Sequence, residues 1–289
     1  MLLKAFAKIN WSLDITGTRP DGYHLLDMIM QPISIADDIV LSPAPDLAIT
    51  TGGYPRCAAD SSNLAYRAAE LLRNQFKPES GVHISLHKRI PIGAGLGGGS
   101  ADAAAVLFGL NRLWNLNLSQ DILESFGLQI GADVPFCLRG GLARVRGIGE
   151  IIESEPCCMD YRLLVLQPCR GLSTRAVYTA WHQLNTPSRP DTENVLKALS
   201  DGNPSLLAGS MHNVLEPVSA AQCPEIPEAV EKLLSAGAFA AQMSGSGSAV
   251  FGAFRSKEAA EKARKELSGQ YKNVYLCHSQ TDSIRLMED

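Results

Sequence analysis

A glycine-rich junction between a predicted strand and a predicted helix sets the strongest limit on the fold of this chain. Residues 93–99 read Gly-Ala-Gly-Leu-Gly-Gly-Gly, with five glycines in seven positions. Ahead of them, Val82, Ile84 and Leu86 alternate with polar residues, a pattern typical of a strand with one buried face. Behind them, residues 100–113 are rich in Ala and predict a helix that can pack closely on a sheet.

This junction is suited to binding phosphate. Glycine lets the backbone come close enough to a ligand for several N–H groups to point at it, and the start of a helix adds unpaired N–H groups and a positive dipole end. The alternative is a tight turn that binds nothing. The density of glycines at a strand-to-helix junction favours a phosphate site over that alternative.

Two common phosphate-binding patterns fit poorly. A P-loop needs Gly-Lys-Ser/Thr at its end, whereas Gly99 is followed directly by Ser100-Ala101. A dinucleotide-binding pattern matches formally at Gly93, Gly95 and Gly98, but its acidic residue about 20 positions later should end a second strand. The nearest acid, Asp121, lies where a helix is predicted to begin.

The rest of the chain predicts a mixed α+β protein with short connections. A Pro-Asp-Gly turn at residues 19–22 follows a strand-like stretch, and glycines in residues 140–149 indicate a hairpin. The predicted strands are residues 4–15, 162–167 and 249–254; the predicted helices are 63–73, 119–128, 228–236 and 257–267, with a helix-rich stretch at 192–209 and a loop at 185–192.

Four segments together resemble the GHMP kinases, a family of small-molecule kinases. Residues 91–104 resemble the central phosphate-binding motif of that family. The other three segments are Ala7-Lys-Ile-Asn-Trp-Ser-Leu-Asp-Ile15 with Arg19-Pro-Asp-Gly-Tyr-His24, Gly131-Ala-Asp-Val-Pro-Phe136, and Met243-Ser-Gly-Ser-Gly-Ser-Ala-Val-Phe-Gly252. They occur in family order, and the resemblance runs from residue 4 to about residue 254.

The resemblance implies a two-domain α+β architecture. The amino-terminal domain, residues 1–154, would be ribosomal protein S5 domain 2-like and bind ATP, and the ferredoxin-like carboxy-terminal domain, residues 155–289, would bind substrate. The break in pattern around Pro156 suggests that boundary. The opening segment is similar to the branch of the family that phosphorylates the 2-hydroxyl of 4-diphosphocytidyl-2-C-methyl-D-erythritol, a step in the methylerythritol phosphate route to isoprenoid precursors.

The resemblance assigns catalysis to Asp133 and Lys8. Phosphorylating an alcohol needs an activated hydroxyl, an in-line γ-phosphoryl group and positive charge near the developing negative oxygens. By resemblance, Asp133 accepts the hydroxyl proton while Lys8 stabilises negative charge. Considered without the family, Asp133 before Val134-Pro135 would be a helix cap, and Lys8 a strand lysine with its ammonium in solvent.

The resemblance also assigns the substrate residues. It puts Tyr23 and His24 at the cytidine end and Asn10 near the erythritol hydroxyls. A looser match makes Tyr178 a second face for the cytosine and Thr174 a hydroxyl contact, although a helix-borne Tyr is often only a core-edge residue. The second glycine cluster supplies backbone beside the reacting phosphates, or is merely a flexible hairpin; its expected binding residues are Ser244, Gly245, Ser246 and Gly247.

On the nucleotide side, the triphosphate of ATP is expected in the first glycine loop. Asn63 and Lys88 match family positions near the adenine, although they could equally be a helix N-cap and an ordinary solvated lysine. Mg²⁺ is expected with the ATP, with few protein ligands and no other metal site, since His83 and His87 lie on an alternating strand. The expected phosphate-binding residues are Gly93, Gly95, Gly97, Gly98, Gly99 and Ser100.

Net charge and cysteine content limit which partners and which cellular compartment are expected. Twenty-six basic and thirty acidic residues give a net charge of −4, so no global basic field favours nucleic acid or an anionic membrane, and no obligate protein partner is evident. Seven cysteines without a Cys-x-x-Cys pair favour free thiols in a reducing cytoplasm. The amino terminus lacks the pattern of a signal peptide, and no apolar run is long enough to span a bilayer.

Three alternatives stay open at this point: a sister kinase with another alcohol substrate, an NAD-binding oxidoreductase, and a nucleotide sensor without catalysis. The presence of both Lys8 and Asp133 argues against the sensor. One departure from the family pattern occurs at Asn213-Val214, where the family usually has an Asn-Asp pair. No catalytic role is therefore expected at Val214.

Overall fold

A long antiparallel strand pair organises the first half of the computed structural model, which describes residues 1–54, 57–157, 160–181 and 188–287. Strand β1 (Leu2–Thr18) pairs along its length with β2 (His24–Ala44), and the predicted turn at residues 19–22 joins them. The sheet order is β11-β1-β2-β4-β3, with β5 pairing with β2 and β6 pairing with β5. These further strands are β3 (Ala48–Gly52), β4 (Gly81–His87), β5 (Leu142–Gly147), β6 (Ile151–Glu155) and β11 (Ile284–Met287).

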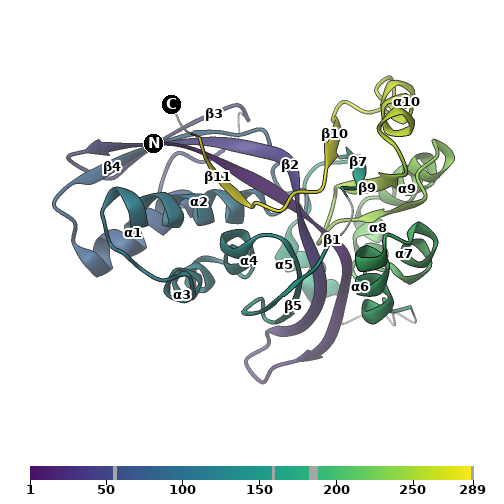
Figure 1. Cartoon of the computed structure of the whole chain (residues 1–289), viewed down its shortest axis with the longest axis horizontal. Coiled ribbons are helices and arrows are strands. Elements are labelled where there is room, and N and C mark those ends of the chain that lie inside the picture. The colour runs from purple at the N-terminus through teal and green to yellow at the C-terminus, as the bar shows by residue number, and fades with distance from the viewer. Residues whose placement is uncertain (55–56, 158–159, 182–187, 288–289) are drawn as a thin grey trace.

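Four helices cover one face of this sheet (Figure 1). They are α1 (Leu64–Phe76), α2 (Gly98–Leu113), α3 (Gln120–Ile130) and α4 (Val134–Arg139). The small residues of α2 let it lie close to the sheet, since a Cβ built on Gly109 would stand 2.4 Å from a Leu41 methyl carbon. The predicted Ala-rich helix is confirmed, but it begins at Gly98 with Gly97 as its N-cap rather than at Ser100.

A second, four-stranded antiparallel sheet carries the other half of the chain. Its order is β10-β7-β9-β8, built from β7 (Arg162–Leu166), β8 (Ala240–Met243), β9 (Val250–Phe254) and β10 (Val274–His278). The accompanying helices are α5 (Thr174–Trp181), α6 (Thr192–Asp201), α7 (Pro204–Ser210), α8 (Glu216–Gln222), α9 (Glu225–Ser235) and α10 (Lys257–Leu267). Part of the predicted loop at 185–192, residues 185–187, lies outside the described residues.

The chain crosses once more between the two sheets near its end. Strand β6 ends the amino-terminal run of the first sheet at Glu155, and β7 begins the second sheet at Arg162. After β10 the chain returns, and β11 pairs antiparallel with the start of β1. The last strand therefore belongs to the first sheet by its pairing.

The expectation of free thiols is wrong for two of the cysteines. Cys169 and Cys223 form a disulfide between residues 54 positions apart in sequence. Spacing could not predict this pair, because the fold, not a local motif, brings the two residues together. Cys57, Cys137, Cys157 and Cys277 are not in a disulfide in the structure, and Cys158 lies outside the described residues. Within the described part of the chain, no helix is both long and apolar enough to cross a membrane.

Candidate active site

A cleft of about 1220 Å³ is lined by residues from β1, β2, the two glycine loops, α2, α5 and the segment before α4. Most of the residues that the sequence singled out lie together in its wall. They are Lys8, Asn10, Tyr23, His24, Asn63, Lys88, Gly93, Gly95, Gly97, Gly98, Gly99, Ser100, Asp133, Thr174, Tyr178, Gly245 and Ser246. Ser244 and Gly247 are buried and do not line the cleft.

The first glycine loop needs glycine because the second loop lies directly against it. Gly95 has a φ of +74°, and a Cβ there would stand 2.1 Å from the carbonyl oxygen of Ser244. Ser244 in turn donates its hydroxyl to the Gly95 carbonyl at 3.1 Å. Any larger residue at position 95 would force the two loops apart. The N-terminus of α2, capped at Gly97, thus opens on the same cleft.

Lys8 and Asp133 meet in this cleft from distant parts of the sequence. The Lys8 Nζ lies 3.5 Å from Oδ2 of Asp133 and donates to Oδ1 of Asn10 at 2.7 Å. The side chain of Lys8 is only 5% exposed, so the alternative of a solvated strand lysine is wrong. Asp133 stands at the N-cap position of α4, but its side chain makes no capping hydrogen bond. Its carboxylate is therefore available to the cleft.

Lys88 is held by two buried carboxylates, which corrects the alternative of an ordinary solvated lysine. Its Nζ donates to Asp102 Oδ2 at 2.6 Å and also to Asp37, and all three residues are buried. Burial favours loss of the Lys88 proton, but the two carboxylates outweigh that effect and raise its pKa. For Asp102, burial disfavours the charged carboxylate and raises its pKa. The Lys88 ammonium is thus engaged by protein on the cleft wall.

Asn63 is the N-cap of α1, as the alternative in the sequence analysis stated. Its side-chain oxygen accepts from the backbone N–H of Ala65 at 2.9 Å, and its amide donates to the Ala58 carbonyl at 2.7 Å. It also lines the cleft, so capping of α1 positions it there.

Aromatic rings gather in one part of the cleft. The rings of His24 and Tyr178 stack with centroids 5.3 Å apart, and the edge of Trp181 meets His24 at 5.7 Å. Tyr23 is 61% exposed beside them. The Thr174 and Ser246 hydroxyls lie 2.9 Å apart and join α5 to the second glycine loop. A flat, partly apolar ligand fits this aromatic part of the cleft.

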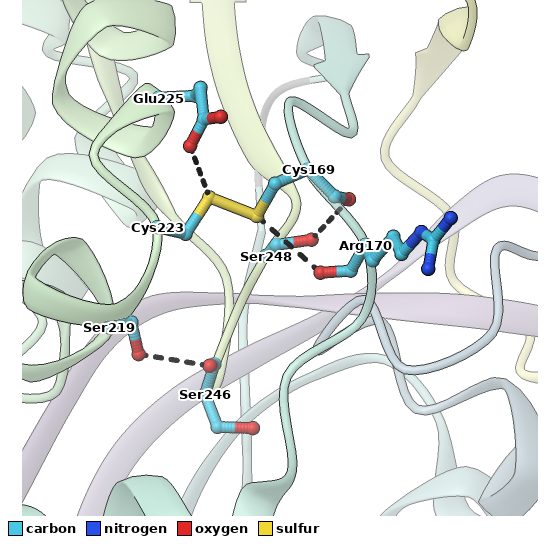
Figure 2. The surroundings of a disulfide bond; sticks show 7 residues. All are labelled: Cys169, Arg170, Ser219, Cys223, Glu225, Ser246 and Ser248. Carbon is cyan, nitrogen blue, oxygen red and sulfur yellow. Dashed lines mark hydrogen bonds between the residues drawn. A yellow bond between two sulfur atoms is a disulfide. The ribbon is translucent and has the colours of Figure 1, made fainter.

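The second glycine loop is held from both sides (Figure 2). Ser219 on α8 donates to the Ser246 carbonyl at 3.0 Å, and Ser248 donates to the Cys169 carbonyl at 3.1 Å. The Cys169–Cys223 disulfide links the segment before α5 to the end of α8, so it connects the two supports covalently.

Asn213 supports the second glycine loop, a role that the sequence did not predict. Its side-chain amide donates to the carbonyls of Met243 and Gly245 at 2.9 and 2.8 Å. Val214 is buried, and its backbone N–H donates to the Leu13 carbonyl. Asp37 and Asp102 were missed as well. The signal for Asp102 was a lone acid in an Ala-rich, otherwise apolar helix, a position that needs a buried partner.

Family comparison agrees with this architecture. Residues 63–141 match the GHMP kinases N terminal domain, and residues 195–273 match the GHMP kinases C terminal domain. Solved structures of a homoserine kinase from Cytophaga hutchinsonii and a mevalonate kinase from L. major share the fold, each with a TM-score of 0.75, at 20% and 17% identity. The chain belongs to the GHMP kinase family and is a small-molecule kinase of the expected two-domain α+β fold. ATP is the phosphate donor of that family.

Relatives with higher identity share one name, 4-diphosphocytidyl-2-C-methyl-D-erythritol kinase. The protein of that name from Alkaliphilus metalliredigens is 43% identical over 280 residues, 96% of each chain. The one from Acetivibrio thermocellus is 44% identical over 258 residues, 89% of this chain and 91% of its own. A crystal structure of 4-(cytidine 5'-diphospho)-2C-methyl-D-erythritol kinase aligns with a TM-score of 0.81 at 33% identity, covering 96% of this chain and 99% of that one.

Proposed function

We propose that this kinase transfers the γ-phosphoryl group of ATP to the 2-hydroxyl of 4-diphosphocytidyl-2-C-methyl-D-erythritol. The observation that carries the proposal is the pairing of Lys8 with Asp133 at 3.5 Å, beside two glycine loops in a cleft that aromatic rings also line. The names of the relatives at about 40% identity over nearly the whole chain support the choice of substrate.

In this reaction Asp133 accepts the proton of the attacking hydroxyl. The substrate oxygen forms a bond to the γ-phosphorus while the bond between that phosphorus and the β–γ bridging oxygen breaks, which releases ADP. Lys8, buried and fixed by Asn10, places positive charge beside the oxygens that gain negative charge. Asn10, which also lines the cleft, is assigned to the erythritol hydroxyls.

The nucleotide occupies the glycine loops. Residues 93–100 and the N-terminus of α2 receive the phosphates, with Asn63 and Lys88 on the adenine side. Mg²⁺ accompanies ATP and offsets phosphate charge. The donor chemistry suits it, because Oδ1 of Asp102 is a buried oxygen of a cleft-lining residue with no hydrogen-bond partner in the described part of the chain. The Ser100 hydroxyl is a second hard oxygen donor there.

The substrate takes the aromatic end and the second glycine loop. Tyr23, His24 and Tyr178 surround the cytosine, and Thr174 with Gly245 and Ser246 contacts the substrate near its phosphates. Ser244 holds the two loops together from behind the cleft wall, and the Gly247 N–H donates to the Ser244 carbonyl within the second loop. We further propose that residues 1–154 form the ATP-binding unit, residues 155–289 the substrate-binding unit, and that the enzyme acts in the cytoplasm, where ATP is available.

The direct test is a coupled assay that detects ADP with the cytidyl substrate, mevalonate, homoserine and other alcohols in parallel. The proposal expects kcat/KM for the cytidyl substrate to exceed that for every other alcohol by orders of magnitude. Preference for mevalonate or homoserine would assign a sister activity, and ATP binding without ADP release would assign a sensor. A His24→Ala variant should lower discrimination between the cytidine and uridine forms; unchanged discrimination would remove His24 from base recognition.

A further inference from the structure

A second hollow lies apart from the catalytic cleft, where the first sheet meets β10 and α10. Its volume is about 600 Å³. Four of its lining residues are cationic, and no Asp or Glu is among those that the structure describes there. The cations are Lys4, Arg89, Arg264 and Arg285. A chain with a net charge of −4 would not gather four cations around one hollow by composition alone.

Strand register places this hollow on the sheet face opposite the catalytic helices. Lys4 on β1 lies opposite Asp38 and Arg285, while its neighbour Ala5 lies opposite Asp37. Successive residues of a strand point to opposite faces. Asp37 shares Lys88 with Asp102 of α2, so the Lys4 row faces away from α2. In Figure 1 the helices α1–α4 lie below the sheet, and β10 and α10 stand on the other side.

The positive charge in the hollow is incompletely balanced. Asp38 is shared between Lys4 at 2.7 Å and Arg89 at 2.6 Å, and Asp282 pairs with Arg285 at 2.9 Å. Arg264 has no ion pair with any carboxylate in the described ranges of the chain, and its side chain is exposed. Four cations and two carboxylates leave an excess of two positive charges at this one place.

The floor of the hollow is apolar. Ile35, Ala36 and Leu276 line it together with Phe6 and Tyr275. The Arg285 guanidinium lies 5.2 Å from the Phe6 ring centroid, a contact that fixes the direction of that side chain. A basic rim around an apolar floor suits a small anion that carries a short apolar body.

We propose that this hollow is a second ligand site, for a small phosphate-bearing molecule. Guanidinium groups bind phosphate oxygens in bidentate geometry, and Arg89, Arg264 and Arg285 offer three of them. Arg264 lies on α10, beside the second sheet. Arg89 follows β4 and Arg285 lies on β11, both of the first sheet, so the ligand contacts elements of both sheets. It also contacts Arg89, whose backbone N–H donates to Asp37 next to Lys88. A bound ligand therefore contacts the segment between β4 and the first glycine loop.

Isothermal titration of the full chain tests the proposal, with a non-hydrolysable ATP analogue saturating the catalytic cleft. The probes are inorganic diphosphate, inorganic phosphate and phenyl phosphate. We expect binding that weakens with added salt and that falls by about tenfold or more in Arg264→Ser/Arg285→Ser. The matched control is Lys257→Ser/Lys265→Ser, which removes two charges from α10 outside the hollow and should bind like the wild type.

The probes also distinguish the source of the phosphate. Tighter binding of phenyl phosphate than of inorganic phosphate assigns the hollow to an organic phosphate, and the opposite order assigns it to free phosphate or diphosphate. Both arginines are largely exposed, so their loss should leave the fold and the basal kinase activity intact. The proposal is overturned if none of the three probes binds at millimolar concentration, or if the two double variants lose affinity equally.

Discussion

At the scale of single residues, the fold turns two ordinary side chains into a reactive pair. Lys8 is a strand residue and Asp133 precedes a short helix, and without the family resemblance neither would be assigned a catalytic role. Close approach of the glycine loop buries Lys8, since Gly97 would place a Cβ 2.9 Å from its side chain. The absence of a capping bond leaves the Asp133 carboxylate facing the cleft.

Removing either partner should stop chemistry without unfolding the protein. For Asp133→Asn we expect kcat to fall by about 10²–10⁴, the usual contribution of a positioned base. For Lys8→Ala we expect a loss of about 10²–10³, since one electrostatic contact to the reacting oxygens is lost. Because Asp133 makes no capping hydrogen bond, Asn should cost little stability. Initial rates and thermal unfolding check this; an Asp133→Asn enzyme with near-native kcat would contradict the assignment.

Lys88 should stabilise the fold by neutralising the two buried carboxylates beside it. Lys88→Met leaves Asp37 and Asp102 buried without a counter-charge, and we expect the free energy of unfolding to fall by about 3–5 kcal/mol. Since the pKa of Lys88 is raised, its contribution is present at neutral pH and is lost only as the pH rises through that raised value.

Urea denaturation of Lys88→Met checks the prediction. The control is the triple variant Lys88→Met/Asp37→Asn/Asp102→Asn, which removes the buried charges together and should recover part of the lost stability. A single variant within about 1 kcal/mol of the wild type would show that the ion pairs contribute no net stability.

Sequence predicted the cleft residues better than it predicted their partners. The phosphate loop, Lys8 and Asp133 could be predicted because they lie in short segments that resemble family motifs. The contacts of Asp37 and Asn213 could not be found in this way, since Asp37 bonds groups 51 to 53 residues away and Asn213 bonds groups 30 to 32 residues away. Lys88, whose alternative was a lysine in solvent, is buried with its charged partners.

At the scale of elements, the second glycine loop depends on its supports. Asn213 fixes the loop through two backbone carbonyls, and α8 and the segment before α5 hold it from either side. Alternation and composition predicted some elements closely, as at α10, which occupies the predicted residues 257–267, but they did not predict the strands β2, β10 and β11. Helix starts were less accurate: α9 begins at Glu225 rather than at Glu228, because Pro224 and the first-turn acids extend it.

Loss of the disulfide should destabilise this region measurably. Cys169 and Cys223 close a loop of 54 residues, and the chain-entropy relation gives about 4 kcal/mol for a loop of that length. We expect the Cys169→Ser/Cys223→Ser variant to unfold at lower urea concentration by an amount corresponding to about 2–4 kcal/mol. A reductant should lower the stability of the wild type similarly and leave the double variant unchanged. Equal stability of wild type and variant under oxidising conditions would rule out a stabilising bond.

At the scale of the whole molecule, both hydrophobic cores contain residues from both halves of the chain. Trp11 on β1 is fully buried, and its ring meets Tyr161 at 5.2 Å and Phe251 at 5.4 Å, both from the second half. Gln242 donates to the carbonyls of Asn10 and Trp11, which ties β8 to β1. The resemblance implied two domains, but it could not show that β1 contributes to both cores.

The return of the chain adds to this interdependence. β11 covers the free edge of β1, and the N–H of Phe6 donates to the Ser283 carbonyl at 2.9 Å. A fragment of residues 1–154 would expose that edge together with Ile9 and Trp11. Unpaired edges and exposed apolar residues promote aggregation. The proposed domain boundary therefore separates two sheets without separating two independently stable units.

We accordingly expect residues 1–154, expressed alone, to be insoluble or to unfold without cooperativity. Co-expression with residues 155–289 should restore a soluble complex with kinase activity, because the second fragment supplies β11 and the aromatic partners of Trp11. Size-exclusion chromatography and urea denaturation of each preparation check the expectation, with the intact chain as control. If the 1–154 fragment is monomeric and unfolds in one cooperative transition, β1 is stable without the second half, and the two units share less of their core than their contacts indicate.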